Sequence, residues 1–475
     1  MNKKALNFVK NFSYTLTSNF LSLFISTLVI LIVPKLLGVE EYGYWQLYMF
    51  YISYVGFLHF GWNDGIYLRY GGKDYIDLNK KLFFSQFWML VLFQSALLVI
   101  LIIASNLFIQ DIDKLFIIKM TAIGMLIVNI RGMLLYLMQA TNRIKEYAQI
   151  TMLEKIIYCL LIILFLVVGF RNYKILILAD TAGKLFALLY STYCCRDIVF
   201  RKISDLYISI REAFQNISVG IQLMFANIAS LLIIGVVRFG IERTWDVATF
   251  GKVSLIISIS NLVMIFVNAI GIVIFPLLRR TNEENLLKIY HTMRSLLMVP
   301  LLGLIIVYYP LKLIISLWLP QYADSLIYLV LIFPMCIYEG KMALLINTYL
   351  KTLRKEKLIL VINIITVIFS LIFTILFTLL FKNLTLAVTS IVILVAIRCI
   401  LAEKILSKIL NLNVNKDILF EMLLSILFIL LGWYVASIYG IIIYLITYII
   451  YLIIKRQEIV ITISELKILL KRERG

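Results

Sequence analysis

The stretch FFSQFWMLVLFQSALLVILIIA, residues 83–104, contains no charged side chain. As an α-helix it is about 33 Å long, enough to cross the roughly 30 Å hydrocarbon core of a bilayer. The whole chain has the same character, because 63% of its 475 residues are hydrophobic, only 15% are charged, and the mean hydropathy is +0.99. No run alternates in the manner of a barrel strand. The composition therefore predicts an all-α polytopic membrane protein.

Apolar runs of similar length recur along the chain and predict about fourteen transmembrane helices. An even number of spans places both termini on the same side of the membrane. The predicted spans are residues 12–34, 44–61, 83–104, 116–139, 150–170, 173–194, 216–237, 253–277, 289–309, 326–350, 358–380, 384–403, 418–436 and 438–454.

Lysine and arginine are distributed unevenly between the connecting segments. If the N-terminus is cytoplasmic, the inner segments hold most of the cations, including the tail 455–475, and the outer loops hold few. The positive-inside rule then predicts that both termini are cytoplasmic. The formal net charge of +19 reflects this asymmetry and an attraction to anionic membrane lipid. Because the cations are scattered, the sequence argues against a nucleic-acid partner.

The sequence predicts two lobes of six helices each, followed by two more helices. The segment RDIVFRKISDLYISIREAFQ is amphipathic and is expected to form a surface helix between the lobes. Because six is even, the lobes would be parallel pseudo-repeats. The predicted divisions are an N-terminal lobe 1–195, an amphipathic linker 196–215, a C-terminal lobe 216–410, spans 13 and 14 in 411–454, and a basic cytoplasmic tail 455–475.

Five ionisable side chains are predicted well inside spans: Arg131, Asp180, Lys184, Glu339 and Lys341. Each costs about 2.5 to 3.5 kcal/mol at a helix centre, so such residues normally face protein or water. Aligning the inner ends of the fourth and tenth spans places Arg131 and Lys341 at matched depth, roughly 12 to 14 Å from the cytoplasmic boundary. Two cations at one depth predict a binding plane for an anionic substrate.

The remaining intramembrane charges leave alternatives open. Asp180 lies four residues before Lys184, which permits an ion pair along one helix, either for self-neutralisation or within a transport path. Glu339 and Lys341 point about 200° apart on a regular helix and cannot pair with each other. We expect Lys341 to face a cavity, and Glu339 to meet a cation, to respond to a coupling ion, or to tie its helix to a neighbour. Pro334 and Gly340 predict a loosened helix here.

Several classes of chemistry find no support in the sequence. The five cysteines have no metal-ligand spacing, and His59 and His291 are isolated, so no metal or cofactor is expected. No nucleophile with a base and no phosphate-cradling glycine loop is present. The sequence therefore predicts a protein that is not an enzyme.

Several segments, in their order along the chain, resemble a known family. They are NFSYTLTSNFLSLFISTLVILIVPKLLGVEEYGYWQLY (residues 11–48), FGWNDGIYLRYGGKD (60–74), YLMQATNRIKEYAQI (136–150), IVIFPLLRR (272–280) and LWLPQYADSLIYLVLIFP (317–334). Together they resemble Wzx-type polysaccharide flippases of the multidrug/oligosaccharidyl-lipid/polysaccharide exporter superfamily. The resemblance covers essentially the whole chain.

The resemblance implies two lobes in a V around a central cavity, in the bacterial cytoplasmic membrane. The substrate would be an undecaprenyl-diphosphate-linked oligosaccharide, moved from the inner to the outer leaflet for O-antigen, capsule or exopolysaccharide synthesis. Arg131, Lys341 and Lys184 are the positions that could hold the diphosphate. Asp180 and Glu339 are the candidates for coupling to H⁺ or Na⁺. Membrane lipid and the polysaccharide polymerase machinery are the implied partners.

The first span departs from the related lipid II flippases, because it has no Arg or Lys after Lys10. Asn19, Ser22 and Ser26 form one stripe there instead, and Asn19 is our candidate substrate contact in this helix. By analogy with the same family, spans 13 and 14 would form a groove for the polyprenyl tail.

Two other functions compete with the flippase. A cation-coupled multidrug exporter of the same superfamily would use intramembrane carboxylates, whereas the predicted balance of three cations to two acids favours an anionic substrate. A membrane polysaccharide polymerase or ligase would carry functional residues in a large outer loop. The longest outer loop, residues 310–325, is mostly apolar and lacks paired carboxylates and histidine.

Overall fold

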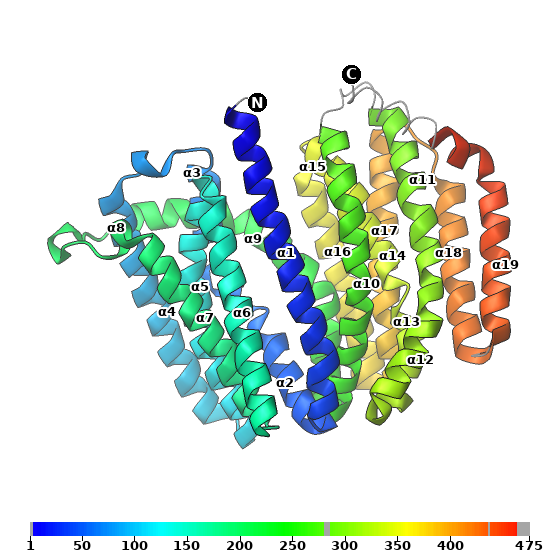
Figure 1. The fold of residues 1–475 in the computed structure, drawn as a ribbon, viewed down its shortest axis with the longest axis horizontal. Coiled ribbons are helices and arrows are strands. Elements are labelled where there is room, and N and C mark those ends of the chain that lie inside the picture. The colour runs from blue at the N-terminus through cyan, green and yellow to red at the C-terminus, as the bar shows by residue number, and fades with distance from the viewer. Residues whose placement is uncertain (1–2, 280–285, 436–437, 463–475) are drawn as a thin grey trace. The chain divides into compact units, whose positions relative to one another are not determined.

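The structure, a computed structural model, describes residues 3–279, 286–435 and 438–462, and these residues contain helices and no strand (Figure 1). The chain divides into two compact units. The first comprises residues 1–228 and 247–251, and the second comprises residues 229–246 and 252–475. The protein is thus all-α and polytopic, as the composition predicts. The boundary between the units lies within a helix, beyond the predicted linker 196–215, and the predicted lobe boundaries remain a prediction.

The first unit is built from long helices that pack on their sequence neighbours, with α6 against α7, α4 against α5 and α1 against α6. Short 3₁₀ turns (η) connect several of them. Its elements are α1 (Lys3–Leu36), α2 (Val39–Ile52), η1 (Val55–His59), α3 (Trp62–Tyr70), η2 (Tyr75–Asp77), α4 (Lys80–Phe108), α5 (Ile112–Ala140), α6 (Ile144–Val168), α7 (Tyr173–Cys194), α8 (Arg196–Val199), η3 (Ile203–Asp205) and the first part of α9 (Ile210–Thr244).

The second unit contains the rest of α9 and most of α10, and its helices are more often interrupted. Segments η7, η8 and η9 are π-helical, whereas η5 and η6 are 3₁₀. The elements are α10 (Val247–Arg279), α11 (Leu286–Leu304), η5 (Ile305–Val307), α12 (Tyr308–Trp318), η6 (Pro320–Tyr328), α13 (Leu329–Ile332), α14 (Met335–Lys341), η7 (Met342–Ile346), α15 (Asn347–Thr352), α16 (Glu356–Thr374), η8 (Ile375–Leu380), α17 (Leu384–Ile409), α18 (Asn415–Leu430), η9 (Leu431–Val435) and α19 (Ile438–Ile454).

Among the described residues, 11 helices are long and apolar enough to cross a membrane, or up to 13 if each of two bent helix pairs is one span. One pair, residues 320–332 and 335–352, bends by 42° at the break that contains Pro334. Its second helix includes the π-helical segment η7, which begins directly after Lys341. The loosening predicted around Pro334 and Gly340 is therefore confirmed. The predicted turn between spans 13 and 14 lies outside the described residues, as does the predicted tail beyond residue 462.

The predicted span 44–61 is not one continuous helix. Helix α2 ends at Ile52, and a turn at residues 53–54 separates it from η1. Phe60 (φ 53°) and Gly61 (φ 82°) then adopt the left-handed conformation, which ends η1 before α3 begins. These two turns position η1 and α3 so that both line a cavity described below.

Close approach of α3 to the first part of α9 depends on small residues. A Cβ on Gly65 would lie 1.8 Å from the carbonyl oxygen of Asn216, and one on Gly220 would lie 2.0 Å from that of Gly61. Only glycine permits backbones to come this near. The motif FGWNDG, residues 60–65, is therefore a helix-packing motif in this structure.

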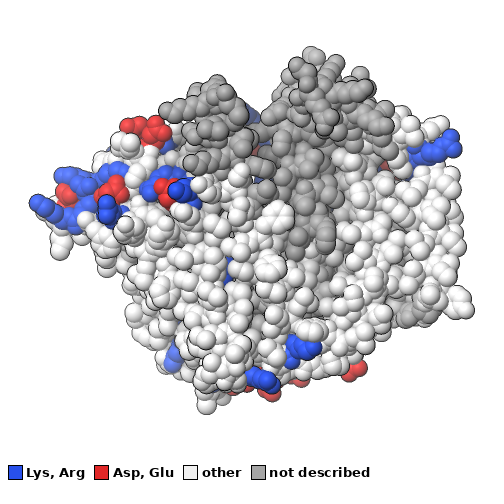
Figure 2. Space-filling model, in the orientation of Figure 1, with Lys and Arg blue, Asp and Glu red and all other residues white. Residues whose placement is uncertain are grey.

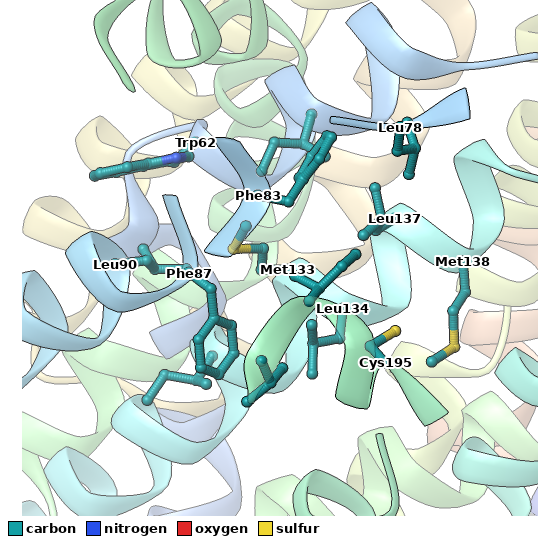
Figure 3. Packing of buried hydrophobic residues seen from close by; sticks show 14 of the residues in the cluster. Trp62, Leu78, Phe83, Phe87, Leu90, Met133, Leu134, Leu137, Met138 and Cys195 are labelled. Carbon is teal, nitrogen blue, oxygen red and sulfur yellow. The ribbon is translucent and has the colours of Figure 1, made fainter. Parts of the chain in front are cut away.

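Large apolar side chains fill the space between α3, α4, α5 and the segment after α7 (Figure 3). Phe83 and Leu90 of α4 cluster with Met133 and Leu134 of α5, and these four side chains are at most 1% exposed. In water, burying one side chain of this size contributes roughly 1.5 to 3 kcal/mol to the free energy of folding. Within a bilayer, close van der Waals packing between helices stabilises the fold instead. This core fixes α5 against its neighbours.

The segment 196–215 does not form the single amphipathic helix that we predict from its sequence. It comprises the four-residue α8, η3, an irregular stretch, and the start of α9. Its backbone is bonded to side chains of α4 instead: Trp88 Nε1 donates to the Val199 carbonyl oxygen (3.3 Å) and Gln86 Nε2 to that of Ser209 (3.1 Å). These tertiary hydrogen bonds satisfy groups that a helix would otherwise pair. We call residues 196–209 the strap.

Charged side chains gather where the strap meets α4. Lys80 pairs with Asp197 (3.0 Å), and Lys81 and Arg201 both pair with Asp205 (3.0 Å each). Figure 2 shows a group of basic and acidic side chains over the α8 region, whereas much of the surrounding described surface is uncharged. Phe200, Ile203 and Ile208 are 69, 84 and 79% exposed. Apolar groups beside fixed charges are typical of a segment at a membrane interface.

Candidate functional site

Arg131 lies on α5, a 29-residue helix whose N-terminus is capped by the Asp111 carboxylate. The side chain is buried, and its Nη1 donates to Glu154 Oε2 of α6 at 2.5 Å. The guanidinium Nε is buried and has no hydrogen-bond partner. Pairing with Glu154 lowers the cost of placing a cation inside the bundle, while one donor stays unsatisfied.

A polar cavity of about 330 Å³ is lined by Arg131 in the first unit. Its walls come from η1, α3, α5, the start of α6 and the first part of α9. The lining includes Gly56, Phe57, His59, Asn63, Asp64, Val128, Asn129, Arg131, Gly132, Leu135, Tyr136, Gln139, Tyr147, Met224 and Asn227. A cavity of this size is comparable to the small-molecule sites of other proteins.

The asparagines of this cavity are held in place by hydrogen bonds, yet each has a free oxygen. Asn63 Nδ2 donates to the Asn129 carbonyl oxygen (3.0 Å), and Asn129 Nδ2 donates to Gln94 Oε1 (2.9 Å). Both side chains are 0% exposed, and neither Oδ1 has a partner. Buried polar groups are normally satisfied, so these atoms and Arg131 Nε are available to a ligand or to water.

His59 and Asp64 also line the cavity and face each other across 3.6 Å, from His59 Nε2 to Asp64 Oδ2. The backbone N–H of Gly61 donates to His59 Nδ1 (3.0 Å), which leaves Nε2 as the atom directed toward the acid. From the sequence, we expected His59 to be isolated. The left-handed turn at residues 60–61 brings it beside Asp64, a partner that lies outside the predicted span.

Lys184 and Asp180 on α7 form the ion pair that their spacing predicts, and Tyr48 of α2 donates a second hydrogen bond to the same carboxylate (2.7 Å). Both charged side chains are less than 10% exposed. Neither residue lines the cavity around Arg131. The self-neutralisation alternative thus has a structural basis, and a transport role for either residue remains a prediction.

Lys341 is 1% exposed and donates to Glu403 of α17 and to Glu421 of α18, the latter at 2.6 Å. Arg294 of α11 pairs with the same two acids, at 2.9 and 2.5 Å. Asp417 and Lys455 extend this buried ionic network. Lys341 does not line the cavity around Arg131. Its packing therefore favours a structural role, and its predicted contact with substrate is untested.

Glu339 meets a cation, which is one of the outcomes considered for it. Arg398 of α17 donates to Glu339 Oε1 at 3.2 Å, to Asn363 Oδ1 of α16 at 2.9 Å and to Ser230 Oγ of α9 at 2.9 Å. Arg398 thereby joins four helices. The interaction ties α14 to its neighbours, and a response of Glu339 to a coupling ion remains a prediction. Asn19 is exposed on α1, where no described contact gives it a role.

Five partners in these ion pairs were not identified from the sequence: Glu154, Arg294, Arg398, Glu403 and Glu421. Each lies inside or at the end of a predicted span, which was the available signal. The predicted intramembrane balance of three cations to two acids is consequently wrong, because the described parts of the spans hold these further charged side chains. Every one of the three cations has a carboxylate partner, so the ion count no longer favours an anionic substrate. Among the described residues, no group of His, Cys, Asp and Glu is arranged to hold a metal ion.

No protein-family model matches the sequence, and no curated protein matches it. Solved structures do match the fold. One is an inward-facing multidrug resistance MATE family transporter of the MOP superfamily, with a TM-score of 0.61, 13% identity, and coverage of 82% of this chain and 98% of that chain. Another is the lipid II flippase MurJ in an inward closed conformation, with a TM-score of 0.60, 14% identity, and coverage of 94% and 99%.

A third solved structure, MATE in the bent conformation, matches with a TM-score of 0.53 and 14% identity over 82% of this chain and 93% of that chain. At such low identity these likenesses concern the fold alone. The chain is an all-α polytopic membrane protein with the fold that these transporters and the flippase share.

Proposed function

We propose that this protein is a flippase that moves undecaprenyl-diphosphate-linked oligosaccharide repeat units from the inner to the outer leaflet by alternating access. The observation that carries the proposal is the cavity in the first unit, where Arg131 and two asparagines keep unpaired polar atoms inside an apolar bundle. A guanidinium suits a diphosphate, because its planar donors bind two phosphate oxygens at once. Asparagine side chains suit the hydroxyl groups of a sugar.

The Arg131–Glu154 pair gives this site a way to release its ligand. In the resting state Glu154 compensates the guanidinium, and an incoming diphosphate competes with the carboxylate for the same donors. A buried cation without any partner would bind an anion too tightly to turn over and would be costly to insert. We infer that Glu154 weakens diphosphate binding and so permits release at the outer leaflet.

The lipid II flippase structure matches 94% of this chain, and the two MATE structures above each match 82%. By analogy with polysaccharide flippases, the final helices α18 and α19 would hold the polyprenyl tail. Translocation by this protein would supply repeat units for O-antigen, capsule or exopolysaccharide synthesis. The polysaccharide polymerase machinery would be the downstream partner.

The other predicted site residues carry separate expectations. Lys184 and Lys341 would have to give up ion pairs to reach a diphosphate, and Asp180 and Glu339 would have to give up theirs to bind H⁺ or Na⁺. Asn19 needs no such exchange, because it is exposed. Arg131 is therefore the residue on which the proposal depends.

A multidrug exporter is the second candidate, because two carboxylates lie at this site. Asp64 lines the cavity, and Glu154 pairs with Arg131, which also lines it. The two functions predict opposite results for one pair of variants in proteoliposomes. For a flippase, Arg131→Gln abolishes translocation of a labelled undecaprenyl-diphosphate sugar, and Glu154→Gln keeps or tightens its binding. For an exporter of organic cations, Glu154→Gln or Asp64→Asn abolishes drug transport, and Arg131→Gln spares it.

The control for this experiment is Arg201→Gln, which removes an arginine from an ion pair in the strap and does not line the cavity. Protein abundance in the membrane is measured for every variant. Full translocation by Arg131→Gln at normal abundance would refute the flippase assignment of this cavity.

A further inference from the structure

We propose that a basic hollow in the second unit binds the phosphate of an anionic phospholipid headgroup. The hollow has a volume of about 740 Å³ and lies where the connection between α15 and α16 meets the C-terminal end of α17. Four cations line it: Arg354, Lys355, Lys357 and Lys408. Glu356, Leu358, Ile405 and Ile409 complete the lining, so four positive charges face one negative charge.

None of the four cations forms an ion pair or a side-chain hydrogen bond with any residue in the described part of the chain. All four are exposed. Elsewhere in this unit Arg294, Lys341 and Arg398 each have a carboxylate partner. Like charges held close together repel each other unless an anion lies between them. Among the described residues, the hollow therefore concentrates four positive charges with Glu356 as the acid in its lining.

The backbone holds these cations in position. Arg354 follows Leu353, the C-cap of α15, and adopts the left-handed conformation (φ 53°), and the N–H of Lys355 donates to the Leu350 carbonyl oxygen (2.7 Å). This is the geometry of a helix C-cap, which turns the chain sharply. The turn brings Arg354 and Lys355 next to the start of α16, so that they share one surface with Lys408 of α17.

Apolar side chains in the lining point to a lipid as the ligand. Ile405 and Ile409 are four residues apart on α17 and therefore lie on one face, and Ile409 is 38% exposed. A lining that combines cations with apolar side chains matches a molecule that has a phosphate joined to glycerol and acyl chains. A free phosphate ion would gain nothing from the isoleucines.

The predicted topology places this hollow on the cytoplasmic side, where anionic lipids give the membrane surface a negative potential. Each Lys or Arg near such a surface strengthens binding roughly fivefold. The proposal does not depend on the substrate that the protein transports, because the hollow and the cavity around Arg131 share no residue.

The test uses the full-length protein in detergent, with binding of phosphatidylglycerol and phosphatidylcholine compared by native mass spectrometry. The wild type is expected to prefer phosphatidylglycerol by tenfold or more. The variant R354Q/K355Q/K357Q/K408Q should lose this preference. A control of equal charge loss, K145Q/K202Q/R211Q/K416Q, removes four exposed cations outside the hollow and should keep it.

A second variant covers the case in which the fourfold variant does not fold. Glu356→Gln removes the only acid of the hollow and should tighten phosphatidylglycerol binding severalfold. The proposal is overturned if the wild type shows no preference, if the hollow variant keeps it, or if both fourfold variants lose it equally. Displacement of phosphatidylglycerol by millimolar inorganic phosphate or glycerol phosphate would also overturn it, because the ligand would then be the free anion.

Discussion

Buried charges in this protein are compensated by residues far away in the sequence. Lys341 donates to Glu403, which lies 62 residues further along the chain, and to Glu421, which lies 80 residues further along. Breaking a buried ion pair from one side leaves an uncompensated charge, which typically costs more than the intact pair contributes. The network as a whole therefore matters more to the free energy of unfolding than any one ion pair within it.

Replacing Lys341 with Met is expected to destabilise the protein by roughly 3 to 5 kcal/mol, because Glu403 and Glu421 then share only Arg294. Denaturant or thermal unfolding in detergent measures the change. Lys404→Met, an exposed neighbour of Glu403, is the control and should change stability by less than about 0.5 kcal/mol. Lys341→Met combined with Glu403→Gln should recover part of the loss. Wild-type stability of Lys341→Met would show that the network is not structural.

Residue-level prediction from the sequence succeeded where partners are close in the chain. The Asp180–Lys184 pair follows from a spacing of four residues on one helix. The Arg131–Glu154 pair does not, because it joins two helices whose relative rotation no single sequence specifies. Glu154 also lies near the end of its predicted span, where a carboxylate is expected to face water.

At the scale of elements, contact between α3 and α9 depends on glycine. Gly65→Ala is expected to destabilise the first unit by about 1 to 3 kcal/mol, because its Cβ would clash with the Asn216 carbonyl and force the helices apart. Gly38→Ala is the matched control, since a Cβ there meets nothing within 4 Å and the residue has a negative φ. Equal melting temperatures for the two variants would contradict this account of the helix contact.

The strap depends on ionised Asp197. Burial raises the pKa of this carboxyl, but hydrogen bonds from Tyr75 and Lys80 outweigh burial and hold the pKa below its usual range. A carboxyl with a depressed pKa stabilises the fold above the unfolded value of about 4, and this contribution is lost as the pH falls through the folded value. The strap should therefore be firmly held at neutral pH and loosen in acid.

Asp197→Asn is expected to loosen the strap at pH 7. Faster amide hydrogen exchange in residues 196–209 would report the change. Asp205→Asn, which removes the pairs with Lys81 and Arg201 at the other end of the strap, tests whether the two attachments act separately. Unchanged exchange in Asp197→Asn would exclude this carboxylate as an anchor.

Elements were predictable from the sequence wherever a long apolar run was uninterrupted, as in α4, α5 and α17. Prediction was wrong for residues 196–215, where amphipathicity favours a helix but side chains of α4 capture the backbone. It was also wrong for 44–61, where α2 ends at Ile52, a turn follows, and the left-handed Phe60 and Gly61 separate η1 from α3. Both differences arise from tertiary contacts or backbone choices that hydrophobicity does not encode.

At the scale of the whole molecule, the predicted topology is open to direct measurement. In a variant without its five cysteines, single cysteines at Lys355 and Lys202 should resist a membrane-impermeant thiol reagent added outside intact cells. Cysteines at Lys114 and Lys382, in predicted outer loops, should react. Lysis should make all four reactive. The reverse pattern would place both termini outside and move the basic hollow to the wrong leaflet for its proposed ligand.

The all-α polytopic class followed from composition and run length. The described residues hold 11 to 13 candidate spans against the fourteen predicted for the whole chain, and the choice of substrate did not follow from the sequence. Arg131 was found because arginine is rare within a span, yet its cavity depends on Asn63 and Asn129, which resemble ordinary polar residues in the sequence. Only the broken second span brings them together with His59 and Asp64. The geometry of the proposed site thus arises where the regular helix pattern is interrupted.

The ionic network in the second unit has a mechanical consequence. Cations from α11 and α14 are shared by acids from α17 and α18, so sliding any one of these helices past another would expose several charges to hydrocarbon at the same time. The ionic network therefore holds these four helices together as one rigid unit. If the protein transports a substrate as proposed, the conformational change would bend the chain elsewhere and move this unit as a whole.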